Sequence, residues 1–161
     1  MCVIIKSNFK TTDLKISILS TSDDLEKEAK AFDERIEERT KAGFIPDVRR
    51  AVKCEYFYKS FFRDPYLIKL FLQEEINYFL EMLKKYSYPG ARILDVGCGS
   101  GYISLELARS GYHVTGIDIS SKVIDVAKKT LESNPFKDGF GSLKYHVSSF
   151  DEFDGKFDRV L

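Results

Sequence analysis

The sequence contains little that would indicate a covalent scaffold, a metal centre or a membrane span. Its three cysteines, at positions 2, 54 and 98, cannot all pair with one another, and none stands in a metal-ligand spacing. No apolar run approaches the roughly 20 residues that a bilayer-spanning helix needs. The apolar stretch after Met1 is too short for the core of a signal peptide. These absences predict a soluble protein of the reducing cytoplasm, with no metal site and no membrane partner.

The chain also has no excess of positive or negative charge. The 161 residues include 25 basic and 25 acidic side chains, so the formal net charge is zero, and no long run of like charges occurs. Such a chain lacks the positive field that non-specific binding to nucleic acid requires, so no nucleic-acid partner is expected. The 43% of apolar residues are enough to fill the core of one domain, while 31% charged residues favour solubility.

The first half of the chain is predicted to be mainly helical. Residues 1–20 show a weak strand-like alternation, which fits a loose arm equally well. Apolar residues at helical spacing predict a helix from Thr21 to about residue 42, which ends at Gly43. An aromatic segment predicts a second helix over 46–62, and Asp64 followed by Pro65 predicts the start of a third that reaches Tyr86. We therefore expect residues 1–89 to form an N-terminal arm and a helical cap.

After Gly90 the pattern alternates between strand and helix. Strands are expected over 92–96, 113–118 and 143–147, with the beginning of a fourth over 157–161. Helices are expected over 101–110 and from Ser120 or Ser121 to just before Pro135. This order predicts parallel pairing through crossover helices. The fold class is therefore α/β, with helices covering both faces of the sheet.

The most informative segment joins the first of these strands to its helix. It reads Ile-Leu-Asp-Val-Gly-Cys-Gly-Ser-Gly over residues 93–101. Glycines at alternate positions permit a tight turn and let a ligand approach the backbone. The first turn of the next helix offers unpaired N–H groups in the same place. Asp95 stands at the carboxyl end of the strand, where open α/β sheets bind ligands, and a carboxylate there suits a ligand that bears an amine.

A second acidic residue ends the next strand. Asp118 follows Gly101 by seventeen positions, and a carboxylate at this strand end can accept both hydroxyl groups of a ribose. Ile119 beside it is suited to lie against an adenine ring. The two strand ends together predict a nucleoside site with an amine-bearing group at its far end.

Two classes of nucleotide-binding protein compete for this pattern. A dinucleotide fingerprint would place its third glycine at position 102, where this chain has Tyr102. This disfavours a nicotinamide-dependent enzyme, which is retained as the weakest candidate. The observed spacing, with Asp95 two residues before the first glycine, resembles that of class I S-adenosylmethionine (SAM)-dependent methyltransferases. The resemblance covers about residues 90–161 and is most specific from Ile93 through Ser120.

The resemblance implies a Rossmann-like sheet and a set of cofactor contacts. Asp95 would contact the methionine amine, directly or through water, and Asp118 would take the ribose hydroxyls with Ile119 on the adenine. The family often has an aspartate after the third strand for the adenine amine. This chain has Ser149 there, which could substitute, as could the backbone N–H of Phe150. The cradle around the methionine portion would be formed by Gly97, Cys98, Gly99 and Gly101.

The resemblance further implies methyl transfer from SAM to an oxygen, nitrogen or carbon atom, with a small molecule as the expected acceptor. No catalytic base can be named from the sequence. The segment over 157–161 resembles the family's fourth strand, so the sheet of this half domain, residues 90–161, is expected to be incomplete, with three to four parallel strands. An alternative is therefore a non-catalytic or truncated SAM-binding fragment that needs a completing chain, and a homo-oligomer is also left open.

Overall fold

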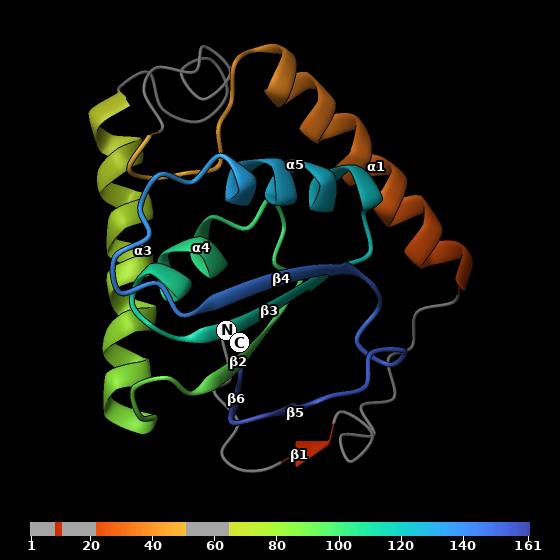
Figure 1. Ribbon diagram of the computed structural model, residues 1–161. Coiled ribbons are helices and arrows are strands. Elements are labelled where there is room, and N and C mark those ends of the chain that lie inside the picture. The colour runs from red at the N-terminus through yellow and green to blue at the C-terminus, as the bar shows by residue number, and fades with distance from the viewer. Residues whose placement is uncertain (1–8, 11–21, 51–64) are drawn as a thin grey trace.

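The computed structural model of the protein describes residues 9–10, 22–50 and 65–161, and a parallel sheet lies at its centre (Figure 1). Four strands pair in the order β4–β3–β2–β6, all parallel. Their bounds are Arg92–Val96 for β2, His113–Asp118 for β3, Ser142–Val147 for β4 and Arg159–Val160 for β6. The predicted α/β class and its three to four parallel strands are thus confirmed.

Two short helices form the crossovers between the strands. α4 (Tyr102–Arg109) joins β2 to β3, and α5 (Ser121–Glu132) joins β3 to β4. Their apolar sides pack on the sheet because apolar residues recur at helical spacing on each helix. The resulting core is built from side chains that alternate along the strands and from the facing helix positions, among them Ile93, Val114, Leu143, Leu105 and Ile124.

The long helix α3 (Pro65–Tyr86) starts and ends where the sequence predicted. Phe79 and Leu83 belong to the same buried cluster as the sheet and α4. The hydroxyl of Tyr102 on α4 donates a hydrogen bond to Glu75 of α3, with 2.6 Å between the oxygens. α3 therefore packs as an integral layer of the α/β unit, although it precedes the boundary predicted at residue 89.

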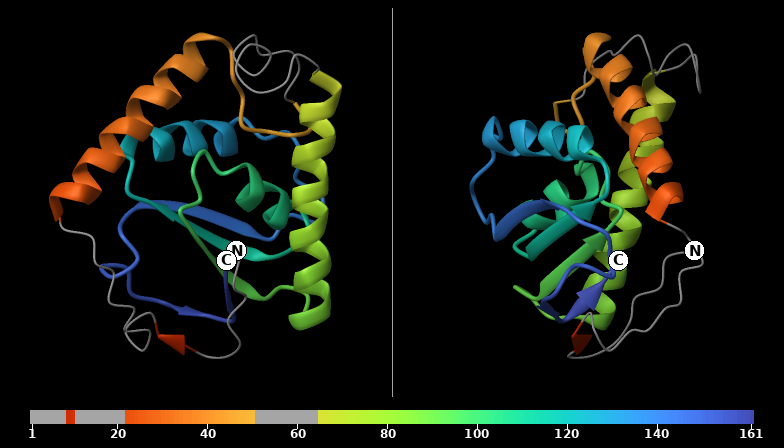
Figure 2. Two further views of the ribbon diagram at one scale, coloured as in Figure 1. Left: turned by 180° about the vertical axis from the view of Figure 1, so that it is seen from behind. Right: turned by 90° about the vertical axis from the view of Figure 1, so that its right-hand side faces the viewer.

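Helix α1 (Ser22–Lys41) lies beside α5 (Figure 2). It is close to the carboxyl ends of the strands, where the glycine loop also lies. The contact includes the buried Ile36 and two polar links, from Asp33 to Ser120 and from Glu37 to Lys122. The predicted helix over 21–42 is confirmed, and it ends before Gly43, whose φ of 83° lies in the left-handed region.

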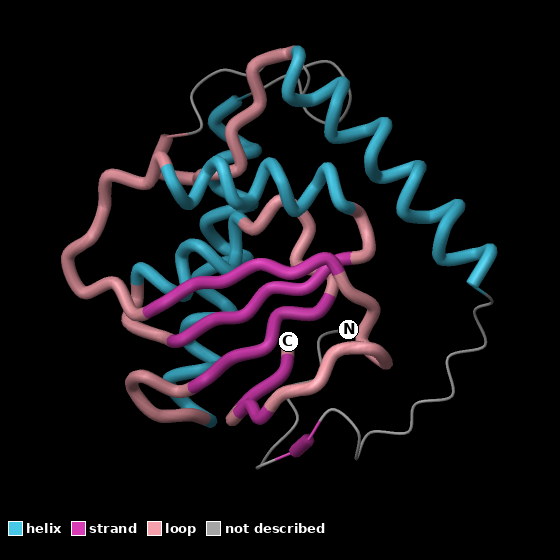
Figure 3. The backbone as a smooth tube through the Cα atoms, turned by 45° about the vertical axis from the view of Figure 1, so that its right-hand side comes forward, coloured by secondary structure: helices cyan, strands magenta, loops and turns pink. Residues whose placement is uncertain are grey.

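The prediction that helices cover both faces of the sheet is not met by the described residues. α3, α4 and α5 contribute to a single core cluster together with the inward-facing strand residues. On the opposite face of β4, Lys144 and His146 are exposed. Figure 3 shows the strands side by side, with the crossover helices on one side of them. The connection from β4 to β5, residues 148–155, has no helix, so helical cover on that face is missing over β4, although Leu94 and Ile117 of the neighbouring strands are buried.

The predicted fourth strand over 157–161 is divided in two. β5 (Lys156–Phe157) pairs antiparallel with β1 (Phe9–Lys10), whereas β6 joins the parallel sheet beside β2. Asp158 lies between the two pieces. Its carboxylate accepts hydrogen bonds from the Arg92 backbone at 2.8 Å and from the Arg92 guanidinium at 3.2 Å. The contact of Asp158 with Arg92 thus holds the point at which the chain passes from the two-stranded sheet to the parallel sheet.

The helix predicted over 46–62 does not begin at Pro46. Residues 48–50 form a turn, and the Asp47 carboxylate accepts the backbone N–H of Arg49 at 3.0 Å, which competes with helical hydrogen bonding. The remainder of that segment lies outside the described residues, and so do Thr21 and the arm over 1–20 apart from the two residues of β1.

Candidate functional site

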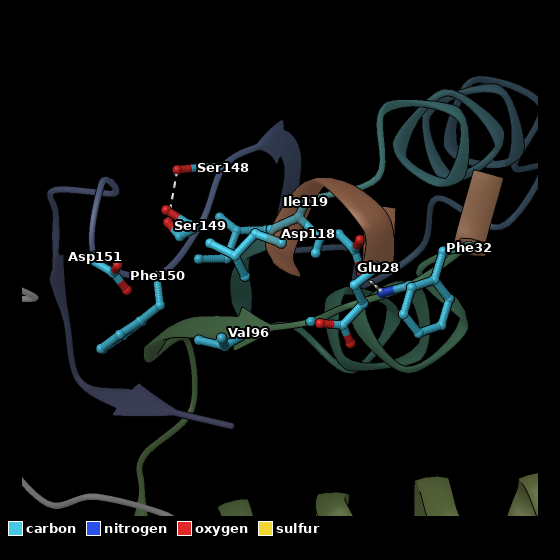
Figure 4. Close-up of a pocket in the computed structure, with 13 residues that line it drawn as sticks. Glu28, Phe32, Val96, Asp118, Ile119, Ser148, Ser149, Phe150 and Asp151 are labelled. Carbon is cyan, nitrogen blue, oxygen red and sulfur yellow. Dashed lines mark hydrogen bonds between the residues drawn. The ribbon is translucent and has the colours of Figure 1, made fainter. Parts of the chain in front are cut away.

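A cavity of about 320 Å³ opens at the carboxyl ends of the strands, below α1 (Figure 4). Its wall is formed by four parts of the chain: α1, the glycine loop, the end of β3 and the segment after β4. The lining residues are Leu25, Glu28, Phe32, Val96, Gly97, Gly99, Ile117, Asp118, Ile119, Ser148, Ser149, Phe150 and Asp151. This is the edge at which parallel sheets bind their ligands, because the loops that follow neighbouring strands converge there.

Asp118 is held at the centre of this wall. One carboxylate oxygen accepts the backbone N–H of Gly99 at 3.0 Å, and the other accepts the N–H of Ser120 at 2.9 Å. A carboxylate offers about four acceptor positions, so two remain for donors from a ligand. Asp118 is therefore both a fixed part of the glycine loop and an acceptor suited to paired hydroxyl groups.

The glycine loop presents bare backbone to the cavity at Gly97 and Gly99. Both have φ in the left-handed region, at 68° and 55°, and a Cβ atom at either would meet no atom within 4 Å. The space beside the loop is thus kept open by the absence of side chains, and a ligand can approach the backbone there. This feature fits a cradle for the methionine part of a cofactor.

Three of the residues predicted to touch the cofactor lie behind the cavity wall. A Cβ on Gly101 would lie 2.2 Å from the hydroxyl oxygen of Tyr145, which donates to the Gly101 carbonyl at 3.0 Å. The side chain of Cys98 is buried in the core, its N–H donates to the Ile117 carbonyl at 3.0 Å, and burial raises the pKa of its thiol. Gly101 and Cys98 therefore shape the loop from the core side.

Asp95 is also turned away from the cavity. Its residue is only 7% exposed, and its carboxylate accepts a hydrogen bond from the Ser104 hydroxyl at 2.5 Å. Burial, with a smaller contribution from the charge of Asp118, raises the pKa of Asp95 to about 6. The structure thus brings Gly97, Gly99, Asp118, Ile119, Ser149 and Phe150 to one cavity and leaves Asp95, Cys98 and Gly101 outside its lining.

Sequence reasoning missed the contribution of α1 to this site. Leu25, Glu28 and Phe32 line the cavity from above, one helical turn apart. Their spacing indicates one helix face, but nothing in the local sequence identifies the surface against which that face docks. Asp151, in the segment after β4, also lines the cavity.

The described residues contain no group of three or more histidine, cysteine, aspartate or glutamate side chains that could hold a metal ion. Among the helices of the described ranges, none has the length and apolar character to cross a bilayer.

Part of the chain is similar to known methyltransferases. Residues 87–161 match the model of a family described as "Methyltransferase domain". The ubiquinone biosynthesis O-methyltransferase of Aromatoleum aromaticum is 44% identical over 75 residues, which cover 44% of this chain and 30% of that protein. The magnesium-protoporphyrin O-methyltransferase of Rhodobacter capsulatus is 40% identical over 73 residues, covering 45% and 31%. The chain thus spans about 30% of the length of these relatives.

A solved structure is similar over a longer stretch. The SAM-bound crystal structure of magnesium protoporphyrin IX methyltransferase from Synechocystis PCC 6803 matches with a TM-score of 0.59 and 20% identity. The match covers 88% of this chain and 62% of that one, and it bears on the fold alone. The predicted resemblance of residues 90–161 to class I SAM-dependent methyltransferases, and the Rossmann-like α/β sheet that it implied, are confirmed.

Proposed function

We propose that this chain binds S-adenosylmethionine in the cavity at the strand ends and belongs to an enzyme that transfers its methyl group. The observation that carries the proposal is the pairing of Asp118 with the bare loop. A carboxylate with two remaining acceptor positions is fixed by the N–H of Gly99, directly beside open space at Gly97 and Gly99. This combination fits an adenosyl group that continues into an amino-acid tail.

In this proposal each part of the cavity wall meets one part of the cofactor. Asp118 accepts the ribose hydroxyls, and Ile119 packs on the adenine. The adenine edge faces Ser149 and Phe150, as the sequence predicted, with the Asp151 carboxylate as an acceptor for the exocyclic amine. These residues lie together on the wall in Figure 4. Asp95, Cys98 and Gly101 support the loop from behind, and any contact of Asp95 with the amine would pass through water.

The bound cofactor would supply an electrophilic methyl group on a sulfonium. The contribution of the chain is to bind and orient that group and to exclude water from it. Leu25 and Phe32 on α1 and Val96 at the end of β2 give the cavity apolar wall on the side of the loop. An enclosure of this kind favours a positioned acceptor over bulk water.

We further propose an oxygen atom of a small molecule as the methyl acceptor. Support comes from the names of the relatives, which describe O-methyltransferases of ubiquinone biosynthesis and of magnesium-protoporphyrin. A cytoplasmic location, predicted from the cysteine content, is part of the same proposal. We also propose that a completing chain or a second copy of this chain pairs with the outer edge of β6. Among the described residues, no strand pairs with that edge.

Isothermal titration calorimetry tests the cofactor assignment. We expect wild-type protein to bind both SAM and its demethylated product S-adenosylhomocysteine. Asp118→Asn should weaken both by about tenfold or more, because a hydrogen bond to a charged group is lost. Asp125→Asn, on the exposed side of α5, is the matched control and should bind like wild type. A folded wild-type sample that binds neither ligand would overturn the proposal.

A further inference from the structure

The charges on the cavity wall are all of one sign. Of the lining residues, Glu28, Asp118 and Asp151 are acidic, and the described lining includes no lysine or arginine. A cavity with three carboxylates and open volume favours a ligand that carries positive charge. SAM has two cationic groups, the sulfonium and the α-ammonium, and the question is which carboxylate meets the α-ammonium.

Two of the three carboxylates already have other positions. Asp118 is held between the N–H groups of Gly99 and Ser120, at the centre of the wall. Asp151 follows Phe150 on the far side of the cavity from α1, as Figure 4 shows. In the proposed function Asp118, although bonded to Gly99, takes the ribose hydroxyls, and Asp151 lies across the cavity from α1, so neither of them is assigned to the α-ammonium.

Asp95 is poorly placed to meet an ammonium group. Its residue is 7% exposed, its side chain points to the helix side of the sheet, and it bonds Ser104 at 2.5 Å. It is absent from the cavity lining. A ligand in the cavity would therefore find the loop backbone between its ammonium group and this carboxylate.

Glu28 occupies the remaining position. It extends from α1 into the same cavity that Gly97 and Gly99 line, and Figure 4 shows its carboxylate on the side of the cavity where Val96 ends β2. Within the described part of the chain Glu28 forms no ion pair. α1 is itself anchored on α5 by Asp33, Glu37 and the buried Ile36. An unpaired carboxylate is thus held over the loop by a docked helix.

We propose that Glu28 is a cofactor-binding residue whose carboxylate pairs with the α-ammonium group of the methionine portion of SAM. The inference rests on the proposed function and adds to it a contact from the N-terminal half of the chain. It makes α1 part of the cofactor site, and it assigns to Glu28 the role that the sequence assigned to Asp95.

Three ligands separate this role from the alternatives. SAM and S-adenosylhomocysteine both carry the α-ammonium, only SAM carries the sulfonium, and 5′-deoxy-5′-methylthioadenosine carries neither. By calorimetry, Glu28→Gln should weaken SAM and S-adenosylhomocysteine by the same factor, about three- to tenfold for a partly solvated ion pair. It should leave methylthioadenosine unchanged. Glu26→Gln, an exposed position on α1 outside the lining, is the control and should change nothing.

Added salt provides a second measurement. The affinity of wild-type protein for S-adenosylhomocysteine should fall more steeply with salt than that of the Glu28→Gln variant, because the ion pair is screened. Loss confined to SAM would place Glu28 on the sulfonium, and equal loss for all three ligands would mean that it only docks α1. Either result, or unchanged affinities, overturns the inference while leaving cofactor binding intact. If wild type binds none of the three, the proposed function itself fails.

Discussion

The carboxylate of Asp33 on α1 accepts a hydrogen bond from the hydroxyl of Ser120, with 2.5 Å between Oδ1 and Oγ. Ser120 is the N-cap of α5, and its side chain in turn accepts the N–H of Val123. The backbone N–H of the same Ser120 donates to Asp118. One residue therefore connects the N-terminal helix, the start of α5 and the acid at the end of β3.

This connection predicts that Asp33 affects ligand binding although it does not line the cavity. Asp33→Ala should weaken SAM binding by about five- to tenfold in calorimetry, because Ser120 and α1 lose a charge-assisted hydrogen bond. Asp33→Asn keeps an acceptor oxygen and should lose less. Glu37→Gln removes the exposed ion pair to Lys122 at the same interface and should bind like wild type. Equal effects of Asp33→Ala and Glu37→Gln would refute a specific role for Asp33.

A buried ionic cluster fixes the turn at Asp47 to the helices of the α/β unit. The guanidinium of Arg109 donates two hydrogen bonds of 2.8 Å to the Asp47 carboxylate and also contacts Glu106. Burial acts to raise the pKa of Asp47, but hydrogen bonds from Arg109 and Arg50 outweigh it and lower that pKa to about 2. The ring of Phe136 lies 4.7 Å from the centre of the Arg109 guanidinium.

Removing one partner of this cluster should be costly. Arg109→Met leaves Asp47 buried without its main partner, so we expect a loss of about 3–5 kcal/mol in the free energy of unfolding, measured with urea. Adding Asp47→Asn should restore part of that loss. Lys122→Met, whose pair with Glu37 is exposed on both sides, should change the free energy of unfolding only slightly. A loss that small for Arg109→Met would show that the cluster contributes little.

Two glycines of the loop should respond differently to alanine. Gly101→Ala places a Cβ against Tyr145 as well as straining a φ of 82°, so we expect a clear loss of thermal stability. Gly97→Ala meets open space, so only the backbone strain of about 1 kcal/mol applies, but its methyl group enters the cavity. It should weaken SAM binding with little loss of stability. Differential scanning calorimetry and titration together separate the two effects, and matching profiles for both variants would contradict this division.

The buried Asp95 predicts a pH dependence of stability. Its pKa is about 6 in the folded protein against 3.8 for an ordinary aspartate, so the unfolded state ionises first as the pH rises. The contribution of Asp95 to stability is therefore largest below pH 4 and falls between about pH 4 and pH 6. Relative to wild type, Asp95→Asn should gain about 2 kcal/mol between pH 4.5 and 7.5, since the asparagine does not ionise. Urea unfolding at both values measures this, and a pH-independent difference would contradict a buried ionisable Asp95.

Local sequence patterns correctly predicted those elements whose position depends on their own residues. The start of α3 at Pro65, the three strands of the sheet and the Ser120 cap all follow from residues within a few positions. The predicted elements were wrong where contacts with residues distant in the sequence override the local pattern. The turn at Asp47 is held by Arg109, sixty-two residues away. Asp158 divides the last predicted strand through its bonds to Arg92.

The sequence by itself determined the α/β alternation, the bare loop between β2 and α4, and the two acidic strand ends, because each is encoded by residue type and local spacing. Tertiary structure alone decided which of those acids faces the cavity. Strand alternation and packing against α4 turn Asp95 inward to Ser104, whereas Asp118 stays at the wall. It also decided that Glu28 lies over the glycine loop, because the docking of α1 depends on contacts with α5 that are more than eighty residues away in the chain.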